Sequence, residues 1–225
     1  MIRAVDVYDV LGLPAGLRTH MTMTMAVVRL IGAQAAEDMR SVVRDVELTM
    51  ALHDVGNPVK FDFDAATAVA MLGEPSETLP RWRLYSEYMQ ARYGEDDHVA
   101  TGAILNELKV RPDLIELVSK KSSHHFAAIL TREVPAEMLA LYADMRVAPT
   151  GIVSIEERYR EASERYANSG RVGLGGTVKL EQLSDLETAV CTVFNSCPGA
   201  VTPSRAGFIL EDCLNSRLDE AFLSA

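Results

Sequence analysis

The feature that most constrains the fold is the helical spacing of apolar residues along nearly the whole chain. Within residues 14–36 the apolar positions recur at intervals of four, seven and three, as on one face of a helix. These positions are Leu17, Met21, Val28 and Ile31. Alternation of apolar and polar residues at every second position, which is typical of strands, is nearly absent. The sequence therefore predicts an all-α fold.

Capping residues and helix breakers predict where several of these helices begin and end. Asp38 is suited to cap a helix that runs to about His53. A helix over 79–93 carries apolar and aromatic residues, and Gly94 is suited to end it. We therefore expect separate helices in the first half of the chain, with a long loop over 56–78 that has room for one short helix at 65–72.

The ends of the chain and its glycine-rich segment give weaker patterns. Residues 1–13 suggest an irregular lead-in, and one helix is expected over 202–223. Ser154 and Glu157 have the spacing of a capping box and predict the start of a charged helix. The glycine-rich segment 171–177 lacks the lysine of a phosphate-binding loop, so we interpret it as a connector.

Length and charge restrict the classes of function. A chain of 225 residues is long enough for one sizeable domain, or for a domain with an appendage. A net charge of −10 argues against a nucleic-acid duplex as the main partner. The apolar runs are far shorter than the ~20 residues of a spanning helix, and the N-terminus has no secretory layout. We expect a cytoplasmic protein that does not insert into a membrane, with its three cysteines as free thiols.

The histidines and aspartates that could bind a metal all lie in the first two thirds of the chain. His53 and Asp54 are adjacent at the expected end of a helix, which Gly56 and Pro58 then stop. An imidazole nitrogen and a carboxylate oxygen are both common metal ligands, although one such pair is weak evidence. The other histidines and a later aspartate strengthen the case. They are His20, His98, His124, His125 and Asp144.

The order of these residues resembles the HD superfamily of metal-dependent phosphohydrolases. Leu52-His53-Asp54-Val55-Gly56 matches the family's His-Asp string. Arg18-Thr19-His20 before an apolar helix matches the setting of its first histidine, and Leu141-Tyr-Ala-Asp144 matches its last aspartate. The resemblance covers about residues 15–168. It implies an HD-domain helical bundle over 1–168, with 169–225 as a C-terminal helical extension on the bundle or at a homodimer interface.

The resemblance also implies a set of metal ligands. The ligands of a first ion would be His20, His53, Asp54 and Asp144. Asp54 would bridge to a second ion, which His98 and His124 would complete as in the dinuclear branches of the family. His125 is a candidate extra ligand, but adjacent helical residues point about 100° apart, so His124 is favoured. His53 and Asp54 are the expected catalytic residues. A lysine frequently follows the glycine of the His-Asp string in this family, whereas this chain has Asn57.

Nitrogen and oxygen ligands without sulfur suit particular metals. They favour one or two divalent ions of Mn, Fe, Co or Mg, and Zn or Ni would also be compatible. Two ions roughly 3.5–4 Å apart could share a hydroxide and lower its pKa towards neutrality. Basic residues near the ligands in sequence are candidates to bind the phosphate oxygens of a substrate. They are Lys60, Lys120, Lys121 and Arg146.

The expected function is therefore a metal-dependent phosphohydrolase, either a phosphomonoesterase or a phosphodiesterase. It would hydrolyse a small phosphorylated substrate or nucleotide through a metal-activated hydroxide. Two alternatives remain open. One is a di-iron oxygenase resembling myo-inositol oxygenase, since that scaffold uses four histidines and two aspartates. The other is a signalling HD domain that has lost turnover.

Overall fold

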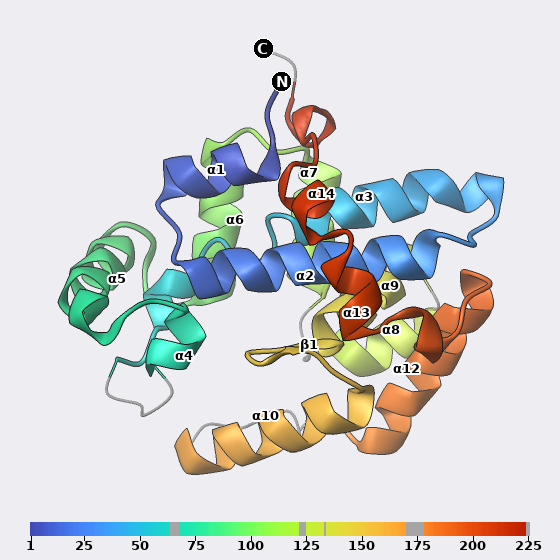
Figure 1. The fold of residues 1–225 in the computed structure, drawn as a ribbon. Helices are drawn as coiled ribbons and strands as arrows, with labels where there is room; N and C mark the ends of the chain where they lie inside the picture. The colour runs from blue at the N-terminus through green and yellow to red at the C-terminus, as the bar shows by residue number, and fades with distance from the viewer. Residues whose placement is uncertain (64–67, 122–124, 133, 170–177, 224–225) are drawn as a thin grey trace.

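Helix α2 (Ala15–Gly32) runs through the middle of the fold, and α3 (Arg40–Met50) and α9 (Pro135–Met145) pack against it (Figure 1). This computed structural model describes residues 1–63, 68–121, 125–132, 134–169 and 178–223. Within those ranges the strands form one antiparallel hairpin, in which β1 (Val147–Ala148) pairs with β2 (Gly151–Ile152). The rest of the regular structure there is helical, which confirms the predicted all-α fold.

The remaining helices surround this central group. They are α1 (Ala4–Leu11), α4 (Ala68–Leu72), α5 (Leu79–Tyr93), α6 (Asp97–Glu107), α7 (Pro112–Lys120), α8 (Phe126–Arg132), α10 (Ile155–Ser169), α12 (Leu180–Val193), α13 (Pro203–Gly207) and α14 (Leu210–Leu214). Short 3-10 turns lie between them at Glu37–Met39, Asn57–Lys60, Ser76–Thr78, Pro198–Ala200 and Asp219–Ala221.

Some of the predicted helix ends are confirmed. Helix α5 ends at Gly94, whose φ of 86° lies in the region that favours glycine. The capping box is also present, because Ser154 Oγ accepts from the Glu157 amide at 3.1 Å and the Glu157 carboxylate accepts from the Ser154 amide at 2.8 Å. Both are local arrangements of a few residues, which a sequence pattern is able to specify.

Other predictions about helix limits are wrong. Asp38 does not cap α3, because it lies inside a 3-10 turn and Met39 stands at the cap position. The lead-in contains helix α1, and the region 202–223 holds two short helices followed by a 3-10 turn instead of one helix. Beyond α14, which ends at Leu214, a long-range pairing takes the place of the expected helix. The Leu218 amide donates to the Ile2 carbonyl, and the Ala4 amide donates to the Ser216 carbonyl.

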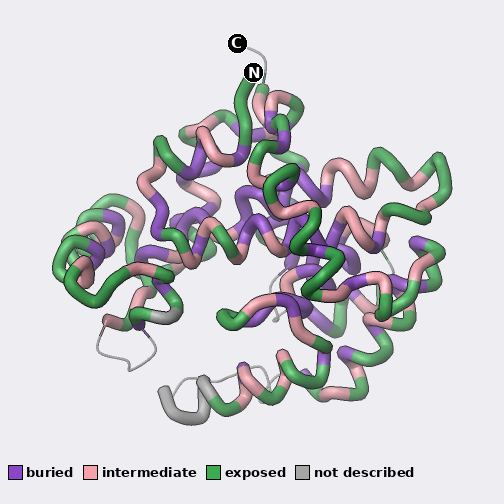
Figure 2. The backbone as a smooth tube through the Cα atoms, viewed as in Figure 1, coloured by how far each residue is buried: buried purple, intermediate pink, exposed green. Residues whose placement is uncertain are grey.

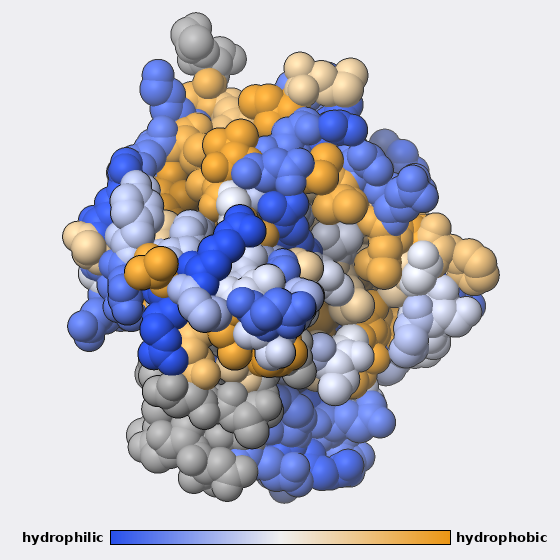
Figure 3. Space-filling view, turned by 60° about the vertical axis from the view of Figure 1, so that its left-hand side comes forward, coloured by the Kyte–Doolittle hydropathy of each residue, from blue (hydrophilic) through white to orange (hydrophobic). Residues whose placement is uncertain are grey.

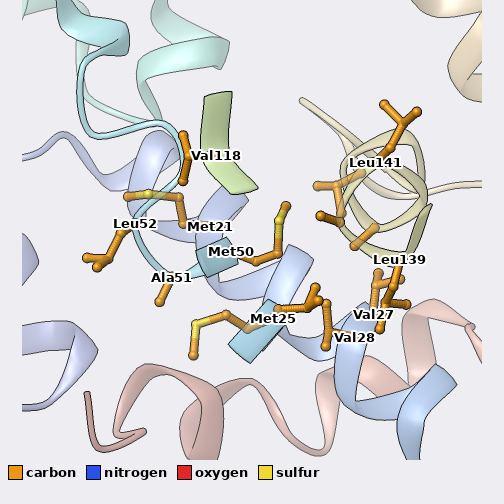
Figure 4. Packing of buried hydrophobic residues seen from close by; sticks show 14 of the residues in the cluster. Met21, Met25, Val27, Val28, Met50, Ala51, Leu52, Val118, Leu139 and Leu141 are labelled. Atoms are coloured by element: carbon orange, nitrogen blue, oxygen red, sulfur yellow. The ribbon is translucent and has the colours of Figure 1, made fainter. Parts of the chain in front are cut away.

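The interior is one continuous apolar cluster. In Figure 4 side chains from α2, from the end of α3 and from α9 point into a shared space. They include Met21, Met25, Val28, Met50, Leu139 and Leu141. Burying a side chain of this size contributes roughly 1.5–3 kcal/mol. The buried stretches in Figure 2 include much of α2, the end of α3 and α9, so His20, His53 and Asp144 are carried by elements that form the core.

The C-terminal helices pack on this central group. Helix α12 contacts α9 and α10, while α13 and α14 contact α2. Arg3, near the start of the chain, and Arg217, beyond α14, form an antiparallel β-bridge. A boundary between residues 168 and 169 stays a prediction, and the glycine-rich segment 171–177 lies outside the described residues.

A buried polar group ties the C-terminal helices to α2 and α3. Glu47 Oε1 accepts from Arg29 Nη2 at 2.7 Å and from the Ser216 hydroxyl at 2.9 Å. These residues come from α2, α3 and the turn after α14. Because a buried carboxylate requires such partners, this contact specifies where the C-terminal segment docks.

Polar and apolar residues are interspersed on the face shown in Figure 3. Across the described part of the chain, no helix combines the length and the apolar character needed to cross a bilayer.

Candidate metal centre

Helix packing brings together four of the residues that the sequence singled out. His20 lies on α2, Asp144 lies in the last turn of α9, and His53 and Asp54 lie in the turn that follows α3. Because α3 packs against both α2 and α9, the end of α3 carries its His-Asp pair to the other two residues. The carbonyl ends of α3 and α9 meet here, and helix C-termini favour a nearby positive charge.

Three donor atoms form a triangle. His20 Nε2 lies 3.3 Å from His53 Nε2 and 3.2 Å from Asp144 Oδ1, and His53 Nε2 lies 3.6 Å from that same oxygen. Ligands about 2.1 Å from one ion are about 3.4 Å apart in a tetrahedron and about 3.0 Å apart in an octahedron. The sides of the triangle therefore match those of ligands that share one ion. Among the described residues these three form a group whose ligand atoms all lie within 4.8 Å of one another.

Asp54 lies against the same pair of histidines. Its Oδ2 is 3.5 Å from His20 Nε2 and 3.4 Å from His53 Nε2. It is not one of the three atoms in the mutual group, so it forms a second triangle on the His20–His53 edge. The Asn57 side-chain amide donates to this oxygen at 2.7 Å and holds it in place.

A backbone contact sets the chemical form of His53. Its Nδ1 lies 2.8 Å from the Met50 carbonyl oxygen, which can only accept a hydrogen bond. Nδ1 therefore carries the hydrogen, and in the neutral ring Nε2 keeps its lone pair for a ligand. A carbonyl behind a metal-binding histidine is a frequent arrangement, because it orients the ring and increases its basicity.

Lys121 is the cationic side chain at this centre. Its Nζ lies 3.0 Å from Asp144 Oδ2 and 3.5 Å from Asp54 Oδ1. Lys121 stands at the C-cap of α7, which packs against α3 and α9. Of the four basic residues proposed from the sequence, this one contacts the candidate ligands.

The charges of Asp54, Asp144 and Lys121 stabilise one another, so all three side chains are ionised. Burial would raise the pKa of Asp54, but nearby His53 and Lys121 outweigh it and hold that pKa below its usual value. Burial opposes ionisation of Asp144 in the same way, but the Lys121 ammonium holds its pKa well below the usual value. Burial would lower the pKa of Lys121, but both carboxylates raise it above the ordinary value. The centre therefore contains two carboxylates and one ammonium group.

The centre is partly open to solvent. The His20 side chain is 21% exposed, and the Asp54 and Asp144 side chains are each 17% exposed. His53 is fully buried, and Lys121 is 6% exposed. Solvent therefore reaches His20 and the two carboxylates, while His53 and Lys121 are buried.

Two of the other predicted ligands do not join this group. His98 is exposed on α6, and His125 is exposed just before α8. Neither belongs to the set of mutually close ligand atoms found in the described part of the chain. His124 lies outside the described residues. A second ion held by His98 and His124 therefore stays a prediction.

The other three candidates for phosphate binding have partners of their own. Lys60 pairs with Asp97, and Lys120 lies 2.5 Å from Glu116 Oε1 and 3.5 Å from Glu137 Oε1. The buried Arg146 donates to the Val153 carbonyl at 2.7 Å and to the Val201 carbonyl at 3.0 Å. In this structure Arg146 joins α9 to the C-terminal segment.

Two contributors to the centre were not assigned a role from the sequence. The Met50 carbonyl orients His53, and Asn57 orients Asp54, each from a position three residues away in the chain. The three-residue spacing around a turn is the only signal that could have indicated them. Their functions depend on backbone conformation after α3, which the sequence pattern predicted as helical up to His53.

Comparison with known proteins adds no identification: no protein-family model matches the chain, and neither a curated protein nor a solved structure matches it.

Proposed function

We propose that this chain is a metal-dependent phosphohydrolase that acts on a small phosphoester or nucleotide. The observation that carries the proposal is the meeting of His20, His53 and Asp144 in one triangle with sides of 3.2–3.6 Å. Asp54 Oδ2 touches both histidine nitrogens and is the fourth donor of the set. The ordered resemblance to the HD superfamily supports the same assignment.

The donor set fits a divalent cation. Two imidazole nitrogens and two carboxylate oxygens, without sulfur, suit Mn²⁺, Fe²⁺, Co²⁺ or Mg²⁺, and also accept Zn²⁺ or Ni²⁺. The carboxylates bring two negative charges and Lys121 offsets one of them, so a single buried negative charge remains. A divalent ion would turn this into one positive charge. That local charge would attract an anionic phosphate, although the chain as a whole carries a net charge of −10.

The residues then have distinct tasks in hydrolysis. When bound, the ion supplies a Lewis acid for the phosphoryl oxygens and lowers the pKa of a water molecule. His20, His53, Asp54 and Asp144 would hold the ion, and the carboxylate of Asp54 would also accept a hydrogen bond from the attacking water. Water adds to phosphorus, the bond to the ester oxygen breaks, and a proton from that water passes to the leaving oxygen.

The test combines metal content with turnover. Protein stripped with a chelator is reloaded with Mn²⁺ and assayed with an aryl phosphate, a diaryl phosphate and a panel of nucleotides. We expect metal to bind and at least one substrate to be hydrolysed. His53→Ala and Asp144→Asn should lose both bound metal and activity.

His98→Ala is the matched control, because it removes an exposed histidine outside the triangle. It should keep the metal bound by His20, His53 and Asp144. Hydrolysis that survives both His53→Ala and Asp144→Asn would contradict the proposal. Oxygen consumption by an iron-loaded sample, without hydrolysis, would favour the oxygenase instead. Metal binding without either activity would favour a signalling domain.

A further inference from the structure

Lys121 places its ammonium group against the outer oxygens of both carboxylates. Asp54 turns Oδ2 towards the histidines, and its Oδ1 lies 3.5 Å from Lys121 Nζ. Asp144 turns Oδ1 towards the same histidines, and its Oδ2 lies 3.0 Å from Lys121 Nζ. Each carboxylate thus presents one oxygen to the candidate metal position and the other to the lysine.

We infer that the Lys121 ammonium occupies the place of a second metal ion, so that the centre holds a single divalent ion. This inference rests on the proposed metal centre and specifies its composition. A carboxylate that bridges two cations presents one oxygen to each of them. Asp54 has this arrangement, but its second cation is a side chain of the protein.

The charge of Lys121 favours a single divalent ion at this centre. A second divalent ion at the outer oxygens would lie within about 4 Å of a buried ammonium, where repulsion is strong because solvent screening is weak. Lys121 is 6% exposed, so its charge has little water to stabilise it and depends on the two carboxylates. Displacing it would leave an unpaired buried charge, which is costly.

The position of Lys121 is specific. It stands at the C-cap of α7, where a positive charge interacts favourably with the helix carbonyl end. Its neighbour Lys120 carries the same charge but pairs with Glu116 and Glu137. Adjacent residues near a helix end point in different directions, so only one of the two reaches the centre.

Lys121 therefore acts through Asp54 and Asp144 as a buried counter-charge. Its ammonium pairs with their outer oxygens and repels a second cation placed near them. In the absence of metal it also offsets one of the two buried negative charges. These roles predict opposite effects of its removal on folding and on metal affinity.

The experiment is a titration of chelator-stripped protein with Mn²⁺, followed by calorimetry and by electron paramagnetic resonance. Wild type should saturate at one ion per chain and give the spectrum of an isolated Mn²⁺ ion. Lys121→Met should melt at a lower temperature without metal, yet bind Mn²⁺ about tenfold more tightly or more, because a repelling charge is gone. Lys121→Arg should restore wild-type melting and stay within about threefold of wild-type affinity, since it keeps the charge.

Lys120→Met is the matched control, since it removes the same charge one residue away. Its affinity for Mn²⁺ should equal that of wild type. Two ions in wild type, or weaker binding by Lys121→Met, would overturn the role of Lys121 and leave the metal centre intact. No bound ion in wild type would instead remove the proposed function itself. If Lys121→Met does not fold without metal, the ion count of wild type decides the question.

Discussion

His53 Nδ1 lies 2.8 Å from the carbonyl oxygen of Met50, the last residue of α3. Because Met50 and His53 are only three residues apart, the orientation of the His53 ring is set as soon as the end of α3 forms. His20 and Asp144 arrive from other helices, and their positions depend on packing. The centre therefore combines one locally determined ligand with two that depend on the tertiary fold.

Metal should stabilise the folded chain, because the donor set exists only when these helices are packed. At a free Mn²⁺ concentration 100 times the dissociation constant, we expect about 2.7 kcal/mol of added stability. Urea unfolding with Mn²⁺ and with a chelator measures the difference. His53→Ala should show no such gain, and an equal gain in that variant would place the ion elsewhere.

Asn57 should matter for metal affinity although it is not a ligand. Its amide donates to Asp54 Oδ2 at 2.7 Å, so Asn57→Ala frees that carboxylate to rotate. Loss of such an outer contact typically costs about 10- to 100-fold in metal affinity. Calorimetric titration with Mn²⁺ would measure it. Wild-type affinity in Asn57→Ala would show that the contact does not orient the ligand.

Gly56 should not tolerate a side chain. A Cβ there would lie 2.3 Å from the backbone nitrogen of Thr101 on α6, and a backbone atom cannot move aside easily. We expect Gly56→Ala to lower the free energy of unfolding by about 2 kcal/mol or more. The control is Gly102→Ala on α6, the helix that carries Thr101, because a Cβ at Gly102 meets no atom within 4 Å. It should stabilise the protein by about 0.5–1 kcal/mol, as measured by urea unfolding.

Arg146 should act on stability and not on substrate binding. It is buried and joins the Val153 and Val201 carbonyls to the Glu187 carboxylate, 3.4 Å from its Nη1. Arg146→Met leaves the two carbonyls without this donor and the Glu187 carboxylate without its cation, and we expect a loss of about 3–5 kcal/mol. The exposed pair of Arg160 with Glu156 serves as the control, since Arg160→Met should cost no more than about 1 kcal/mol.

If Arg146 bound phosphate, as the sequence suggested, its loss would weaken substrate binding. Inorganic phosphate titrated into the folded, metal-loaded variant distinguishes the two roles. We expect wild-type affinity for phosphate. A large loss of affinity with unchanged stability would return Arg146 to the substrate site.

The three free cysteines should react with alkylating reagents at different rates. Burial raises the pKa of Cys191 and of Cys213 to about 11, whereas Cys197 is exposed. The reactive thiolate is the form that loses a proton, so at pH 8 only a small fraction of either buried thiol reacts. We expect one fast thiol per chain at pH 8, with the other two reacting as the pH approaches 11 or as the chain unfolds. Mass spectrometry of the labelled peptides identifies them, and rapid labelling of Cys213 in folded protein would contradict the prediction.

The sequence by itself determined the features that depend on a few neighbouring residues. The helical class, the end of α5 at Gly94 and the capping box at Ser154 all follow from short-range spacing. The candidate ligands His20, His53 and Asp144 were also evident, because their residue types and order are written in the chain. Short-range patterns fail where distant segments compete. The expected C-terminal helix would run to residue 223, but α14 ends at Leu214 and Leu218 pairs with Ile2.

Only the tertiary structure decided which charges meet the ligands. Lys60, Lys120, Lys121 and Arg146 are equivalent candidates in the sequence, yet only Lys121 contacts Asp54 and Asp144. The choice depends on how α7 is rotated about its axis and how closely it packs on α3 and α9. A rotation of about 100° separates neighbouring residues on a helix, so packing determines which of two adjacent lysines is buried with the carboxylates.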